Sequence, residues 1–224
     1  MKLRVTYIVN LSSYLVHANS LIGPWKTTGV AVWNGFITDH PSWTKLWAPD
    51  VHYEPESNKY HMYYAISTRG SHDSIIGAAS SPDMTPGSST DHGAILHSIV
   101  NSRYNAINAN WVSVKAKPYL NFASNLAYNG TASHHIEAPF MFQHNDWYYL
   151  LFSSVVMCRS KSSHGHFVDK VGEACLKCGG TTLLASHDHI YGPGGQDIFE
   201  GKQYGHVLYY RYAGISIGLS RFQY

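Results

Sequence analysis

The chain has 224 residues, and its 16 lysines and arginines nearly balance 14 aspartates and glutamates, giving a formal net charge of +2. This balance argues against nucleic-acid binding, which needs a basic surface, and no apolar run reaches the ~18 residues that span a bilayer. Only 13% of residues are charged, whereas the chain contains 17 tyrosines and 6 tryptophans. These aromatics suit stacking on sugars, although the strands of any β-protein favour them as well.

The beginning of the chain fits two descriptions. Lys2 and Arg4 precede apolar positions and the small Ala18 follows them, which is typical of a signal peptide. Asn10 and two nearby serines interrupt the apolar stretch, however. We therefore expect a β-strand here rather than a signal peptide.

Strand-like aromatic runs follow, and no long segment carries the 3.6-residue apolar pattern of a helix. Four runs resemble one another, because each ends in an aromatic followed by a small residue: 59–67, 117–124, 146–154 and 206–213. Their terminal aromatics, Tyr64, Phe122, Phe152 and Tyr212, are 58, 30 and 60 residues apart. A period near 60 favours the blades of a β-propeller over the alternative, an ordinary β-sandwich. The step of 30 predicts that about half a blade is missing between Phe122 and Phe152.

Hydrolysis of a glycosidic bond commonly takes two carboxyl groups, so carboxylates among aromatic and small residues are candidate catalysts. Asp39 is most simply a turn residue, and Asp50 is either a candidate or a cap before a strand. Glu137 lies between Ile136 and Ala138-Pro139, with no obvious solvating neighbour. It is the strongest candidate, with a satisfied, half-buried glutamate as the alternative.

Three cysteines leave one thiol unpaired. Cys175-x-x-Cys178 alone is a weak zinc signal, because no second pair completes a tetrahedral site. In a secreted protein we expect a disulfide from Cys158 to either Cys175 or Cys178. The pattern His187-Asp-His189 permits chelation in a strand, but it has no evident third ligand.

In combination, these residues resemble one family, the fungal endo-1,5-α-L-arabinanases of glycoside hydrolase family 43. The matching blocks run in family order from about residue 14 to residue 218: 18–25, 46–50, 63–77, 90–93, 104–107, 136–139, 158–160, 179–187 and 191–196. The resemblance implies an all-β, five-bladed β-propeller and inverting hydrolysis of α-1,5-linked arabinan. It implies a general acid, a general base, and an aspartate that tunes the pKa of the acid.

The resemblance assigns roles to four residues of this sequence. Glu137 falls on the general acid, and Trp47 falls on a cleft residue positioned for sugar stacking. Tyr104 and Asn105 fall on the loop that lines the cleft. Arabinan or its oligosaccharides are therefore the expected partner of an extracellular monomer that binds neither nucleic acid nor membrane.

Three departures from the family pattern put full activity in doubt. The general base belongs to a His-Asp-Pro motif upstream of the first matching block, and we expect the chain to begin after it; the sequence Asp39-His40-Pro41 is a scrambled look-alike. Asn108 stands where the pKa-tuning aspartate is expected, and a neutral amide cannot raise a pKa by charge repulsion. Arg211 replaces the usual histidine beside a central metal ion, and its fixed positive charge is a poor neighbour for a cation. No cofactor is expected to be required.

Residues 1–224 are therefore expected to form a single, incomplete propeller domain that lacks a first-blade strand and about half of a middle blade. The expected function is that of an arabinan endo-1,5-α-L-arabinosidase-like hydrolase. The alternative is an inactive remnant that at most binds arabinan. An unpaired strand edge would make such a chain unstable or prone to aggregate.

Overall fold

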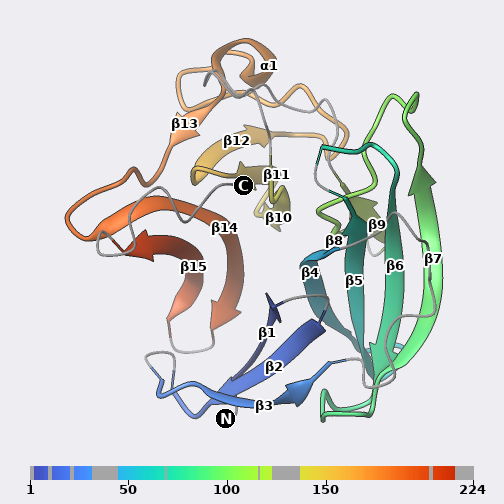
Figure 1. Ribbon diagram of the computed structural model, residues 1–224. Helices are drawn as coiled ribbons and strands as arrows, with labels where there is room; N and C mark the ends of the chain where they lie inside the picture. The colour runs from blue at the N-terminus through green and yellow to red at the C-terminus, as the bar shows by residue number, and fades with distance from the viewer. Residues whose placement is uncertain are drawn as a thin grey trace. The chain divides into compact units, whose positions relative to one another are not determined.

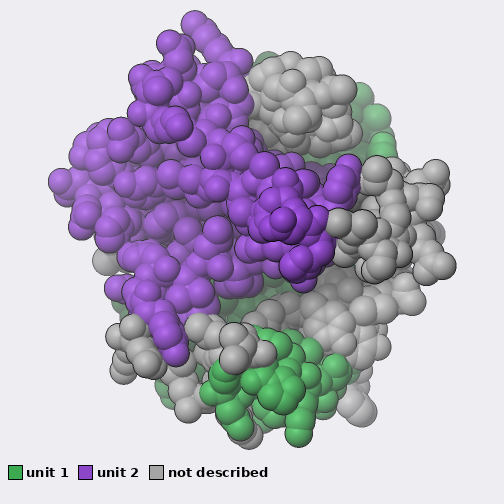
Figure 2. All heavy atoms as spheres, turned by 90° about the vertical axis from the view of Figure 1, so that its left-hand side faces the viewer, with its two compact units in different colours: residues 1–111 green, residues 112–224 purple. Residues whose placement is uncertain are grey.

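The computed structural model describes residues 3–9, 12–20, 23–31, 45–68, 70–115, 117–122, 137–201 and 204–214. The chain divides into two compact units, Met1–Trp111 and Val112–Tyr224 (Figure 2). Each unit is described by itself. No helix in the described part of the chain is long and apolar enough to cross a membrane.

Two antiparallel sheets precede residue 100 (Figure 1). The first contains β1 (Leu3–Val9), β2 (Ser12–Ala18) and β3 (Lys26–Val30). The second contains β4 (Lys45–Glu54), β5 (Lys59–Ser67), β6 (Ser74–Ser81) and β7 (Thr90–Ser98). Each strand pairs with the next along the chain, as in a β-meander.

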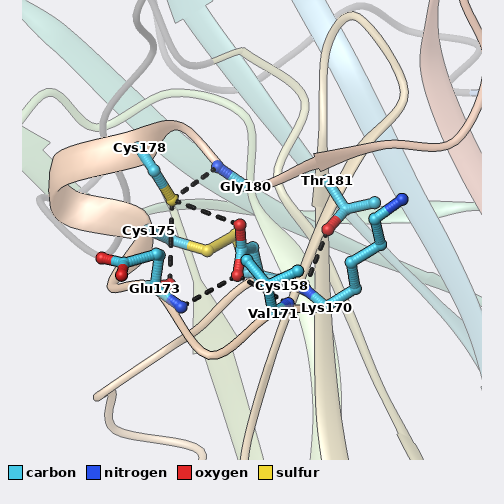
Figure 3. The surroundings of a disulfide bond; sticks show 9 residues. Cys158, Lys170, Val171, Glu173, Cys175, Cys178, Gly180 and Thr181 are labelled. Carbon is cyan, nitrogen blue, oxygen red and sulfur yellow. Dashed lines mark hydrogen bonds between the residues drawn. A yellow bond between two sulfur atoms is a disulfide. The ribbon is translucent and has the colours of Figure 1, made fainter.

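Three further sheets follow in the same manner. They contain β8 (Asn110–Val114) with β9 (Lys117–Asn121); β10 (Phe140–His144), β11 (Trp147–Phe152), β12 (Val156–Ser160) and β13 (Thr181–Thr182); and β14 (Ile190–Gly201) with β15 (Gly205–Gly214). The short helix α1 (Cys175–Cys178) lies between β12 and β13. A disulfide joins Cys158 of β12 to Cys175 (Figure 3), and Cys178 is a free, exposed cysteine.

The cores form around the buried apolar side chains of the central strands. In the first unit, residues of β2, β4, β5 and β6 share one core cluster that includes Leu15, Leu46, Met62, Tyr64 and Ile75. In the second unit, a cluster that includes Met141, Leu150, Phe152 and both disulfide cysteines joins β10, β11 and β12. Burial of this kind contributes about 25 cal/mol per Å² of apolar surface.

The structure bears on three expectations from the sequence. Residues of the first 18 form strands β1 and β2, paired from Leu3↔Ala18 to Val9↔Ser12, as expected. The sheet β8–β9 has two strands among the described residues, and residues 123–136, which fall in the interval between Phe122 and Phe152 where half a blade is expected to be missing, lie outside them. The look-alike motif Asp39-His40-Pro41 lies outside the described residues.

Gly77 permits the close packing of the second sheet, because it lies directly opposite Tyr64 in the β5–β6 register. Tyr64 is fully buried, and its hydroxyl donates a hydrogen bond to Asp91 Oδ1 at 2.7 Å. A Cβ added at Gly77 would overlap the Tyr64 ring.

We therefore expect Gly77→Ala to lower the free energy of unfolding by about 1–3 kcal/mol or to prevent folding, because the core has no room for the extra methyl group. Urea unfolding would measure this. Gly201→Ala is a matched control, since its added Cβ would meet ordinary contacts of 3.4 Å or more. Equal stability of the two variants would contradict this account of the packing.

Candidate active site

Trp47 lies at one end of the second sheet, where β4 begins and β5 ends. It is half-buried, and its indole Nε1 donates a hydrogen bond to the carbonyl oxygen of Ser67 at 3.4 Å. Ser67 is the last residue of β5, and its hydroxyl lies 2.7 Å from that of Ser74, the first residue of β6. The ring of Trp47 is therefore held at the edge where these strands meet.

The loop that follows β7 brings Tyr104 and Asn105 to the same end of this sheet. The Tyr104 hydroxyl donates to the carbonyl oxygen of His97 at 3.0 Å. Asn105 Nδ2 donates to the carbonyl oxygen of Ser71 at 3.4 Å, and the Ser98 hydroxyl donates to Asn105 Oδ1 at 3.4 Å. The three residues predicted to contact substrate thus gather at one end of one sheet.

Asn108 belongs to the same loop, two residues before β8. Its backbone has a φ of 55°, a left-handed conformation that asparagine tolerates better than most residues. Its side chain is half-buried and carries no charge. The position predicted for a pKa-tuning carboxylate is therefore occupied by a residue that also suits the local turn.

Asp50 connects the second sheet to the start of β8. Its Oδ2 accepts the backbone N–H of Trp111 at 2.5 Å and Asn110 Nδ2 at 3.4 Å. The β4–β5 register shifts between Trp47 and Asp50. Asp50 thus fixes the strand that follows the loop of Asn108, a role that the sequence alone did not reveal.

His52 lies against Trp111, with the ring centroids 3.9 Å apart and the planes 12° from parallel. Burial, reinforced by the positive charge of His61 and opposed by Glu54, lowers the pKa of His52 to about 4. His52 is therefore neutral near pH 7. Its folded-state preference for the neutral form contributes stability above pH 6.5 that is lost as the pH falls through 4.

In the second unit, Glu137 lies exposed three residues before β10. Its carbonyl oxygen accepts the backbone N–H of Ser153 at 3.0 Å. The next residue, Ala138, has a φ of 48°, and its carbonyl oxygen accepts Gln196 Nε2 at 2.9 Å. Two hydrogen bonds therefore fix the backbone on which the Glu137 carboxylate is carried.

Gln196 is a residue that the search for carboxylates missed. It is only 3% exposed, and its Oε1 is buried without a hydrogen-bond partner among the described residues. It lies in β14, where the register with β15 shifts on either side of Gly194. The irregular backbone directs this side chain toward the turn of Glu137 and Ala138. The pattern Gly-Pro-Gly-Gly-Gln, unusual within a strand, was the available signal.

Arg211 of β15 lies over the same part of β14. It pairs with Gly194 in the β14–β15 register, and a Cβ added at Gly195 would stand 2.5 Å from Arg211 Nη2. The backbone N–H of Gly195 in turn faces the Ser153 hydroxyl at 3.4 Å. Arg211 is thus close to the strand segment that supports Glu137, and its side chain is exposed.

Asp197 follows Gln196 and is the most strongly perturbed carboxyl of this region. Its Oδ2 accepts the Tyr209 hydroxyl, and its Oδ1 accepts the backbone N–H of Ile198 at 2.6 Å. Burial nevertheless raises the pKa of Asp197 to about 6, against the opposing effect of these two hydrogen bonds. No pattern in the sequence pointed to this carboxyl group.

No group of three or more His, Cys, Asp or Glu side chains in the described ranges is arranged to hold a metal ion. His187 of the His-x-His pattern instead contacts Asp188, with 3.2 Å between Nδ1 and Oδ2. His189 packs edge-on against Tyr212. The pattern therefore belongs to a turn.

The chain is similar to curated arabinan-degrading proteins of fungi, although no family model matches it. It is 45% identical over 252 residues to arabinan endo-1,5-α-L-arabinosidase C of Emericella nidulans, covering 93% of this chain and 78% of the relative. It is 41% identical to the probable arabinan endo-1,5-α-L-arabinosidase C of Aspergillus terreus, covering 94% and 79%. The first alignment is longer than the 224 residues of this chain, so the relative carries internal residues that this chain lacks.

Solved arabinanases share the fold. The native Bacillus subtilis arabinanase matches with a TM-score of 0.73 and 25% identity, covering 92% of this chain and 88% of that one. The Cellvibrio cellulosa α-L-arabinanase complexed with arabinohexaose matches with a TM-score of 0.73 and 21% identity, covering 94% and 86%. This likeness confirms the five-bladed β-propeller class, in place of a sandwich.

The raised pKa of Asp197 predicts a pH dependence of stability. Below pH 3.8 the carboxyl is protonated in both states and its stabilising contribution is complete; the contribution is lost as the pH rises through 6. It amounts to on the order of 1–3 kcal/mol. We therefore expect the free energy of unfolding of Asp197→Asn, whose amide does not titrate, to depend on pH differently from that of the wild type.

Specifically, the difference in unfolding free energy between the wild type and Asp197→Asn should favour the wild type more at pH 4.5 than at pH 7.5. Urea unfolding at both pH values measures it. Asp146→Asn, at an exposed carboxylate in the turn between β10 and β11, is the control and should show no such change. A wild-type advantage that stays constant between the two pH values would refute the assignment.

Proposed function

Because the chain belongs to the family of fungal arabinan endo-1,5-α-L-arabinosidases, within glycoside hydrolase family 43, we propose that it binds α-1,5-linked arabinan and hydrolyses it with Glu137 as general acid. The observation that carries this proposal is the 45% identity that extends over 93% of the chain. Under this proposal, residues 1–224 act as one catalytic domain, shortened relative to the family.

The surroundings of Glu137 support its role as the acid. A general acid must present its proton to the glycosidic oxygen of the leaving group, so its position matters more than its immediate contacts. Glu137 is exposed, while Ser153 and Gln196 bind the two successive backbone carbonyl oxygens of Glu137 and Ala138. The carboxyl is thus available to a ligand on a backbone that is held firmly.

Trp47, Tyr104 and Asn105 are the proposed sugar-binding residues. Trp47 offers an aromatic face for stacking, and Tyr104 and Asn105 offer polar groups for sugar hydroxyls. Their support is their common location at one end of the β4–β7 sheet. Arabinan or arabino-oligosaccharides are the proposed partner, and the extracellular space is the proposed location, in keeping with the Cys158–Cys175 disulfide.

We further propose that turnover is slow. Asn108 cannot raise the pKa of an acid by charge repulsion, as an aspartate would. No residue of this chain is assigned the role of general base, and each group of an acid–base pair contributes roughly 10²–10⁴-fold in rate. A water molecule activated only weakly would then attack the anomeric carbon from the face opposite Glu137.

A central metal ion, which the resemblance implies for the family, does not fit the residues present. Arg211 carries a permanent positive charge and lies against Gly195, where it would repel a nearby cation. The proposed hydrolysis therefore uses no metal ion.

The second candidate is an arabinan-binding protein without turnover. Asn108 favours it, because the substitution removes a carboxyl group while leaving the local turn intact. The internal residues missing relative to the Emericella relative favour it as well. The two candidates differ only in hydrolysis, so an assay of sugar release separates them.

We expect the chain to release reducing ends from debranched arabinan slowly, and Glu137→Gln to lower that rate by about 10²–10⁴-fold, because glutamine cannot donate the proton. A reducing-sugar assay measures both rates. Glu173→Gln, an exposed glutamate of another loop, is the matched control and should keep the wild-type rate. If the wild type releases no more sugar than Glu137→Gln, the chain is not a hydrolase and the binding protein remains.

Trp47→Ala should weaken binding of arabino-oligosaccharides about tenfold or more, because a stacking surface is removed. Isothermal titration calorimetry with the Glu137→Gln background would measure binding without turnover. Tyr53→Ala is the control: Tyr53 is an exposed aromatic at the other end of β4, where its hydroxyl bonds to Asn58 Oδ1 at 2.6 Å. Equal affinities of the two variants for the oligosaccharide would show that Trp47 does not bind sugar.

A further inference from the structure

The end of strand β15 carries a row of aromatic side chains near the turn of Glu137. Tyr210 and Tyr212 are separated by one residue, and their ring centroids lie 6.2 Å apart. Tyr212 is 49% exposed, and His189 packs edge-on against it with the ring centroids 6.4 Å apart. We propose that these three side chains, here called the aromatic wall, bind arabinose rings of the chain held at Glu137. This inference rests on the proposed function and adds a sugar-binding surface in the second unit.

The face of β15 that carries the two tyrosines is turned toward β10. Side chains alternate along a strand, so His206, Tyr210 and Tyr212 lie on one face of β15. The ring centroid of His206 lies 4.6 Å from that of His144 and 5.9 Å from that of Phe142, and both of these residues belong to β10. Tyr210 and Tyr212 therefore face the side of the hairpin on which β10 lies.

The other face of β15 makes its contacts within the hairpin. The Tyr209 hydroxyl donates to Asp197 Oδ2, and the Tyr209 ring packs against Phe199 with the centroids 6.2 Å apart. Arg211 lies over Gly195, where an added Cβ would stand 2.5 Å from its Nη2. The odd-numbered side chains of this segment are thus held by β14, which leaves the even-numbered tyrosines directed toward the neighbouring sheet.

The aromatic wall lies at the end of β10 where the chain enters from Glu137. The start of β15 contacts the last residue of β10, where the rings of His206 and His144 meet. Toward its other end, β15 pairs with the part of β14 from which Gln196 Nε2 reaches the carbonyl oxygen of Ala138 at 2.9 Å. The two strands therefore run in opposite directions, and the end of β15 lies beside the residues that precede β10.

The backbone beneath the aromatic wall is fixed before any ligand binds. His187 and Ile190 exchange two backbone hydrogen bonds of 3.0 and 2.8 Å, which close the turn that carries His189. The β14–β15 ladder continues to the pair Ile190↔Gly214, just beyond Tyr212. A sugar would therefore meet rings that stand on ordered backbone, so binding would not have to order a loop.

The composition of the aromatic wall suits a sugar. A tyrosine ring offers an apolar face to the C–H groups of a sugar, and its hydroxyl can donate to and accept from sugar hydroxyls. It has only two side-chain torsions to fix on binding. The exposed His189 adds a ring nitrogen as a further hydrogen-bonding group. Arabinan, a neutral chain rich in hydroxyls, matches this surface.

Isothermal titration calorimetry of the full chain in the Glu137→Gln background, with arabinohexaose as the ligand, tests the proposal. Tyr212→Ala should weaken binding about fivefold, because a stacking face is lost. Tyr212→Phe keeps the ring and should bind within about twofold of the parent. His189→Ala should weaken binding about two- to threefold, because the Tyr212 ring loses its edge-on neighbour.

Tyr204→Ala is the matched control and should bind as the parent does. Tyr204 is 63% exposed and lies in the turn at the opposite end of the same hairpin. Melting temperatures would verify that the variants are folded. Should Tyr212→Ala fail to fold, Tyr212→Phe and His189→Ala still decide the proposal, since full affinity in His189→Ala would then overturn it.

The outcomes distinguish this inference from the proposed function. If the parent binds arabinohexaose and Tyr212→Ala binds it equally tightly, the aromatic wall takes no sugar, and only this inference is overturned. A parent that binds no arabinohexaose would overturn the proposed function and the inference together. An equal loss of affinity in Tyr204→Ala and Tyr212→Ala would also overturn the inference, because the loss would then not be confined to the end of the hairpin near Glu137.

Discussion

Both faces of the central strands of the second sheet are buried, and this constraint shapes the rest of the first unit. Along β5 and β6 nearly every residue from Met62 to Ser81 within the strands is buried, whichever face its side chain occupies. A sheet buried on one face only would alternate. Such strands need cover on both sides, which a propeller blade receives from its neighbours. Small residues such as Gly77 allow that cover to approach closely.

The residues proposed for function depend on contacts between successive sheets. In the first unit, Asp50 of β4 holds the start of β8, and with it the end of the loop that carries Asn105 and Asn108. In the second unit, Gln196 of β14 holds the carbonyl oxygen beside Glu137. Both side chains are polar and bind backbone groups of another sheet. Each side chain therefore holds a loop in place against the strand that carries it.

The fold and the ends of its strands could be predicted from the sequence because the aromatic repeat records local pairing, which depends on residues close in the chain. The same reasoning placed Glu137 correctly before a strand. It could not find Gln196 or Asp197, because their importance comes from partners far along the chain: Gln196 meets Ala138, 58 residues away. Nor could it choose between Cys175 and Cys178 as the partner of Cys158, since both fit the spacing and only the fold selects Cys175.

The backbone around Glu137 and the turn of Asn108 differ in how strongly the fold constrains them. The hydrogen bonds that hold the Glu137 turn come from the backbone N–H of Ser153, in the turn after β11, and from the buried side chain of Gln196 in β14. Losing them would cost stability, because a buried polar group left without a partner costs about 1–3 kcal/mol. No such loss of stability is expected at position 108, since an amide fits its left-handed turn as readily as a carboxylate. Replacement of a carboxylate at position 108 would therefore disturb the fold less than loss of the hydrogen bonds that hold the backbone of Glu137.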